Sequence, residues 1–147
     1  MDMTARMHIE WQCRNLCYEF AHCIDSRNYE QLAALFTEDG LFDRVGQPLR
    51  GRQAILEGLK KRSTEIRTRH LCHSICFNEV SDTQARAVVY NTTLVGKGDP
   101  DGQPVQYAMS QGAFLEFRDI YRSTAVGWRI AERLAYTVIV PADLPGH

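Results

Sequence analysis

Hydrophobic residues in the first part of the chain recur at steps of three and four, as they do on one face of a helix. Residues 9–24 follow this pattern throughout and predict a long amphipathic helix. Residues 28–36 predict a shorter helix, with Asn28 as its N-cap and Gln31 completing a capping box. Residues 51–62 predict a third helix, whose terminal cations suit the negative end of a helix dipole and are expected to be solvated.

The pattern changes in the second half of the chain, where β-branched and aromatic residues dominate long segments separated by Gly, Pro, Asp and Ser clusters. A turn signal at residues 38–40 and a brief strand at residues 41–43 predict a small hairpin between the second and third helices. Helices followed by an antiparallel sheet indicate an α+β fold, in which three helices wrap one face of a curved sheet. The four long strands are predicted at residues 67–80, 83–97, 105–118 and 127–140.

Size and charge narrow the class of protein. The 147 residues, 44% of them hydrophobic, fit a single domain over residues 1–147 whose core needs neither disulfide nor metal. A formal net charge of -1 offers no field to attract nucleic acid or an anionic membrane. Because no apolar run is long enough to span a bilayer and the N-terminus lacks a signal-peptide core, we expect a cytoplasmic protein. The expected partner is a small hydrophobic molecule.

The cysteines are odd in number, which argues against a disulfide framework and favours reduced thiols. Some of them could be combined with His70 into a metal site, but their spacing lacks the tight pairs of zinc sites. Free cysteine commonly fills cores as a small hydrophobe, and there is no glycine-rich phosphate loop. We therefore expect core filling, no metal and no cofactor. The five residues are Cys13, Cys17, Cys23, Cys72 and Cys76.

A histidine, His70, stands near the start of the first long predicted strand. An imidazole held by a carboxylate can take or give a proton near neutral pH, and Asp25 is a candidate for that carboxylate. Asp25 ends the first predicted helix, where its charge opposes the dipole, although Ser26 and Asn28 are available for local capping. The alternative is structural: a hydrogen-bonded histidine within a sheet and a turn aspartate. His73 has the opposite strand parity and is expected to face away.

Four segments follow one another in an order and at spacings that carry a family resemblance. They are Asp25 with residues 28–36, then residues 49–55, residues 67–70 and residues 127–130. Together they resemble the SnoaL-like, scytalone dehydratase-like branch of the nuclear transport factor 2-like superfamily. The resemblance implies a cone-shaped fold with a deep apolar pocket between sheet and helices. It also implies that Asp25 orients His70 as a catalytic acid–base pair.

The sequence departs from that family at three positions. Val95 stands where the dehydratases have a second pocket histidine, and Ile24 and Arg44 stand where they have two carbonyl-polarising tyrosines. These replacements argue against dehydration of a scytalone-like phenolic ketone. Arg44, which we expect at the pocket rim, could polarise a carbonyl or bind a carboxylate if it points inward.

Strand parity and the resemblance together predict which side chains bind the substrate. The polar candidates are Asn91, Thr93 and Gln111, with Tyr18, Tyr107 and Arg44 in addition. The apolar candidates are Phe20, Ile24, Phe42, Val89, Val95 and Phe114.

The expected activity is that of a cofactor-independent lyase or isomerase, dehydratase- or cyclase-like, acting on a hydrophobic carbonyl compound. In it His70 removes a proton next to the carbonyl or assists loss of water. The alternative is a non-catalytic ligand-binding or structural subunit, resembling the small subunit of ring-hydroxylating dioxygenases. Apolar residues on both faces of the strands, such as Val88 and Val89, predict a homo-oligomer, a dimer or trimer, that covers the outer sheet face.

Overall fold

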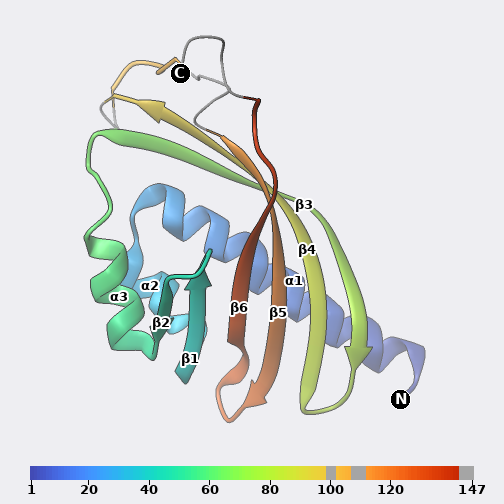
Figure 1. The fold of residues 1–147 in the computed structure, drawn as a ribbon. Coiled ribbons are helices and arrows are strands. Elements are labelled where there is room, and N and C mark those ends of the chain that lie inside the picture. Colours follow the sequence, from blue (N-terminus) through green and yellow to red (C-terminus); the bar gives the residue numbers. More distant parts are fainter. Residues whose placement is uncertain (99–101, 107–111, 143–147) are drawn as a thin grey trace.

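A long helix, α1 (Met3–Ser26), lies across the concave face of a curved sheet, as Figure 1 shows. Two shorter helices, α2 (Tyr29–Ala34) and α3 (Arg52–Lys60), lie at one end of the sheet beside its short strands. The computed structural model describes residues 1–98, 102–106 and 112–142. The described strands are β1 (Phe36–Arg44), β2 (Pro48–Arg50), β3 (Ile66–Val80), β4 (Gln84–Lys97), β5 (Ala113–Thr124) and β6 (Gly127–Ile139). The α+β class that the sequence predicts is confirmed.

The sheet has the strand order β2-β1-β6-β5-β4-β3, and one of its pairings is parallel. β1 runs parallel to β6, with Phe36 opposite Ile130 and Arg44 opposite Ala135. The prediction of a wholly antiparallel sheet is therefore wrong at this pair. Tight turns force hairpin neighbours to be antiparallel, but most of the chain separates β1 from β6, so no such turn fixes their relative direction.

Several predicted boundaries differ from the structure. α1 begins at Met3 instead of residue 9, α2 ends at Ala34 and Phe36 already belongs to β1, and β5 begins at Ala113 instead of residue 105. Two further differences have local reasons. Residues 38–40 lie within β1, where the pairing with β6 is irregular, instead of reversing the chain. At Gly40 an added Cβ would lie 2.9 Å from that of Phe36, so a glycine is needed for this close approach. β5 extends to Thr124 instead of ending at residue 118. Asp119, the first residue beyond the predicted end, is buried within this strand.

The connection between α1 and α2 places the end of α1 against β3. Arg27 adopts a left-handed conformation with φ of 61°, which stops α1 sharply. Its guanidinium donates to the carbonyl oxygens of Ser63 and Ile66, at the entrance to β3. Asn28 caps α2 as predicted, because its side chain accepts the Gln31 backbone N–H. The predicted capping box is not completed: the Gln31 side chain accepts from the Asn28 side-chain amide, and the Asn28 backbone N–H donates to the Cys23 carbonyl.

The core lies between α1 and the concave face of the sheet. Phe20 of α1 stands at its centre, with its ring 5.3 Å from that of Phe42 and 6.3 Å from that of Phe117, measured between centroids. Both contacts are edge-on, the arrangement that aromatic pairs prefer.

The outer face of the sheet carries exposed aromatic residues. Tyr90, Glu116 and Tyr136 form a row across three strands, and both tyrosines are exposed. Val88 is half-buried and Val89 is buried. The oligomer that would cover this face stays a prediction. Within the described part of the chain, no helix combines the length and apolar character needed to cross a membrane.

Candidate active site

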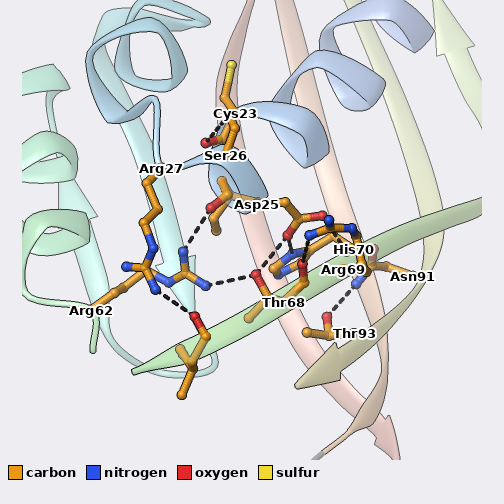
Figure 2. Close-up of polar contacts among 12 residues, drawn as sticks. Cys23, Asp25, Ser26, Arg27, Arg62, Thr68, Arg69, His70, Asn91 and Thr93 are labelled. Atoms are coloured by element: carbon orange, nitrogen blue, oxygen red, sulfur yellow. Dashed lines mark hydrogen bonds and ion pairs between the residues drawn. The ribbon is translucent and has the colours of Figure 1, made fainter. Parts of the chain in front are cut away.

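Asp25 and His70 meet where the last turn of α1 passes the start of β3 (Figure 2). Oδ1 of Asp25 lies 2.6 Å from Nδ1 of His70, and its Oδ2 accepts the His70 backbone N–H at 2.9 Å. Thr68 lies two residues before His70 on the same face of β3, and its hydroxyl donates to Oδ1 at 2.8 Å. The carboxylate thus favours the proton on Nδ1 and leaves Nε2 free to accept another.

The pair is nearly enclosed, and its environment favours the charged form of Asp25. The side chains of His70 and Asp25 are only 11% and 12% exposed. Burial alone would raise the pKa of the Asp25 carboxyl, but the hydrogen bonds and charge of His70, with the Thr68 hydroxyl, lower it below its ordinary value. Asp25 is therefore a carboxylate at neutral pH.

This lowered pKa predicts how the stability of the protein depends on pH. The Asp25 carboxyl stabilises the fold fully above its unfolded pKa, near 3.8, and this contribution is lost as pH falls through the lower folded pKa. We expect the urea midpoint of Asp25→Asn to fall less than that of the wild type between neutral pH and about pH 3. Asp82→Asn, in the exposed β3–β4 turn, is the matched control. Identical acid profiles for wild type and Asp25→Asn would contradict the assigned charge state.

Arg62 holds groups next to the Asp25–His70 pair in place through hydrogen bonds, a role that was not predicted from the sequence. Its Nη1 donates to the Ile24 carbonyl at 2.9 Å and to the Tyr29 hydroxyl at 3.0 Å, and its Nη2 donates to Thr68 at 3.3 Å. The prediction that the cations ending the third helix are all solvated is wrong for Arg62. A guanidinium next to a helix C-terminus satisfies unpaired carbonyls, and here it also fixes Thr68 (Figure 2).

A cavity of about 190 Å³ lies beside His70, between α1 and the sheet. Phe20, Ile24 and Phe42 line it as predicted, and Arg44 lies in the lining. The Nε of Arg44 is buried without a hydrogen-bond partner among the described residues. The residues missed by the sequence predictions are Val45, Leu59, Arg62, Leu115, Phe117 and Ala135.

A second, larger hollow of about 690 Å³ lies on the other side of the pair, lined by residues that include His22, Arg27 and Arg69. Its lining is mainly polar, whereas aromatic and aliphatic side chains surround the smaller cavity. His70 borders both spaces. We take the smaller cavity as the candidate substrate site, because apolar walls with a few convergent polar groups are typical of ligand sites.

Several predicted binding residues share the face of His70 but lie outside the cavity lining. Thr93 pairs with His70 across β3 and β4, and Asn91 donates to the Thr93 hydroxyl at 2.9 Å. Val89 is buried in a neighbouring cluster that includes Phe117. Val95 is half-buried. Tyr107 and Gln111 lie outside the described residues.

Two predicted positions are wrong. Tyr18 is 48% exposed and lines an outer groove, because the buried stripe of α1 passes through its neighbour Cys17. Phe114 is 49% exposed, whereas Leu115 contributes to the cavity. The side chains of β5 alternate without interruption, so Leu115 shares the cavity face with the buried Phe117 and Phe114 lies on the opposite face.

The cysteines separate into different environments. Cys13, Cys17 and Cys23 are buried and Cys72 is half-buried, but Cys76 is exposed, so the prediction of core filling is wrong for Cys76. Among the described residues, no three His, Cys, Asp or Glu side chains are grouped so as to hold a metal ion.

Comparison with known proteins gives one family match. Residues 5–134 match the model of a family described as a SnoaL-like domain. A search of curated proteins found no significant match.

Solved structures share the fold at low sequence identity. A scytalone dehydratase-like protein from Novosphingobium aromaticivorans superposes with a TM-score of 0.77 at 21% identity, covering 95% of this chain and 91% of that one. ActVI-ORFA from Streptomyces coelicolor gives 0.72 at 19% identity, with coverages of 88% and 97%. An NTF2-like protein with a cystatin-like fold from N. aromaticivorans gives 0.71 at 21% identity, with coverages of 93% and 90%.

Proposed function

The chain belongs to the SnoaL-like domain family, and from this premise we propose that it is a cofactor-independent lyase or isomerase acting on a hydrophobic carbonyl compound. The observation that carries the proposal is the 2.6 Å contact between Asp25 and His70 at the wall of an apolar cavity. Structural neighbours of the dehydratase type are consistent with it.

The first step would be proton abstraction by His70. With Nδ1–H bound to Asp25, Nε2 is the basic nitrogen, and it takes a proton from the carbon next to the substrate carbonyl. The imidazolium that forms lies against a carboxylate already ionised, so its positive charge is stabilised without proton transfer to Asp25.

Arg44 is the group best suited to the developing negative charge. Its guanidinium is a multiple hydrogen-bond donor on a residue that lines the same cavity as His70. An enolate oxygen bound by this guanidinium would be stabilised. The proton on His70 would then return to another carbon, which is isomerisation, or assist loss of a hydroxyl group as water.

The cavity volume suits a compact molecule. About 190 Å³ lies below the range of roughly 300–1,000 Å³ common for drug-sized ligands. A protein cavity of about 150 Å³ accommodates benzene, so a single ring bearing a carbonyl suits the available space.

Proton exchange tests the proposal without knowledge of the natural reaction. In D₂O, the protein is expected to accelerate loss of the ¹H NMR signal from carbons adjacent to the carbonyl in some members of a panel of monocyclic ketones. The reference is the buffer-catalysed rate for each ketone. Ketones that bind, as judged by line broadening, but exchange only at the buffer rate would contradict proton abstraction.

A second candidate function is that of a structural or ligand-binding subunit, and we propose it as the alternative. It is favoured by the exposed Tyr90 and Tyr136 on the outer sheet face, which also suit a homo-oligomer. Co-purification with a larger oxygenase chain would favour a role as a structural subunit. A homodimer or homotrimer that catalyses proton exchange in the ketones would favour the enzyme.

A further inference from the structure

Two cysteines on different elements lie side by side in the core. Sγ of Cys17, on α1, is 3.3 Å from Sγ of Cys72, on β3, within hydrogen-bonding distance for sulfur. Cys17 is fully buried, whereas Cys72 is half-buried. The sulfur of Cys72 also lies 3.9 Å from Oδ1 of Asn91. Because Cys17 has no exposed surface, any approach to the pair is from the side of Cys72.

A buried arginine is directed at this pair. Nη2 of Arg133 donates to Sγ of Cys17 at 3.3 Å and to Asp119 at 2.7 Å. The guanidinium carbon lies 4.4 Å from the centroid of the Phe20 ring and 4.5 Å from that of Phe117. Arg133 is wholly buried, and its Nη1 has no hydrogen-bond partner among the described residues. Arg133 therefore has N–H donors in addition to those that bind Asp119.

The surroundings lower the pKa of one of the two sulfurs. The hydrogen bond from Cys72 lowers the pKa of Cys17 to about 7, against the effect of burial and with help from the Arg133 charge. The same hydrogen bond, together with burial, raises the pKa of Cys72, which keeps its proton. A thiolate and a thiol in contact are the reactants from which a disulfide forms.

We propose that Cys17 and Cys72 are a redox-active pair, which a small hydroperoxide converts into a reversible disulfide linking α1 to β3. A small oxidant is required because Cys17 has no exposed surface and only Cys72 borders solvent. A bulky disulfide could not align its sulfurs with the buried thiolate.

The chemistry balances with one peroxide molecule. The Cys17 thiolate attacks one oxygen of hydrogen peroxide, the O–O bond breaks, and the released hydroxide takes a proton to become water. Cys17 is now a sulfenic acid. The Cys72 sulfur attacks the Cys17 sulfur, the S–O bond breaks, and the hydroxide leaves as a second water with the Cys72 proton. Two thiols are oxidised, and the peroxide is reduced to two waters.

The position of the pair gives the disulfide a structural effect. Cys72 is two residues from His70 on β3, and Cys17 lies about two helical turns before Asp25 on α1. A covalent link there would join the two elements that carry the acid–base pair. The proposal stands on the sulfur geometry and does not depend on the proposed enzymatic activity.

The test is treatment of the reduced protein with hydrogen peroxide, followed by intact-mass measurement and peptide mapping. The wild type is expected to lose two hydrogen atoms, with the cross-link between the Cys17 and Cys72 peptides and full reversal by dithiothreitol. Cys17→Ser and Cys72→Ser should abolish the cross-link, whereas Cys76→Ser, which removes an exposed thiol, should retain it. In Cys72→Ser the sulfenic acid on Cys17 has no resolving thiol, so the intact mass should show a gain of one oxygen atom instead of a loss of two hydrogen atoms.

Two results would overturn the proposal. One is oxygen addition, or cross-linking through other cysteines, without the Cys17–Cys72 bond in correctly folded protein. The other is a cross-linking rate that rises only near the ordinary thiol pKa of 9.0 instead of near 7, which would exclude a thiolate stabilised by Arg133.

Discussion

His70→Gln is expected to lower the rate of proton exchange next to a substrate carbonyl by about 10²–10⁴-fold, the usual contribution of a general base. Glutamine can still donate to Asp25, so the fold and the hydrogen bond are retained while the basic nitrogen is lost. The measurement is the deuterium exchange rate of a responsive ketone at saturating concentration. Circular dichroism establishes that the variant is folded.

His73→Gln is the matched control, because it changes the same residue type on the same strand. His73 is exposed, and its Nε2 lies 2.6 Å from the Thr92 hydroxyl, away from the cavity. The rate at which His73→Gln catalyses proton exchange should equal that of the wild type. If His70→Gln catalyses proton exchange in the ketone as fast as His73→Gln, His70 is not the base and the Asp25–His70 pair is structural.

Arg133→Met is expected to lower the free energy of unfolding by about 3–5 kcal/mol, the usual effect of removing one partner from a buried ion pair. Nε and Nη2 of Arg133 bind Asp119 at 2.9 and 2.7 Å, and both side chains are fully buried. Without Arg133, the side-chain donor that Asp119 keeps among the described residues is the Tyr121 hydroxyl, at 2.6 Å. Urea unfolding measures the loss.

Two further variants separate the charge effect from lost packing. Arg118→Met removes an exposed arginine from the same sheet and should cost below about 1 kcal/mol. Adding Asp119→Asn to Arg133→Met should recover part of the stability, because no unpaired charge then remains buried. A loss for Arg133→Met no larger than that for Arg118→Met would contradict this account of the cluster.

The elements with strong periodicity could be predicted from the sequence, as could the contact between Asp25 and His70. Residues 9–24 show the helical pattern clearly, and the family resemblance places Asp25 opposite His70. The role of that pair in catalysis stays a prediction. The β1–β6 pairing could not be predicted, since it joins segments without a turn to fix their direction.

The remaining errors concern polar residues and strand parity. Arg62 reads as one more cation at a helix end, and only the fold shows that the Ile24 carbonyl and Thr68 lie within its reach. Choosing Phe114 instead of Leu115 is an error of strand parity, because the regular alternation of β5 places Leu115 on the same face as Phe117. The predicted strand ends before Asp119, and only the fold places Arg133 beside this buried carboxylate.

The parallel pairing of β1 with β6 also determines when the candidate site can form. Phe42 and Arg44 come early in the chain, whereas Ala135, which faces Arg44 across this pairing, lies on the last strand. Contacts between such distant segments close slowly, because a long loop must be ordered before they form. A chain still emerging from the ribosome can therefore form α1, but it cannot enclose the cavity until β6 has been synthesised and has docked beside β1.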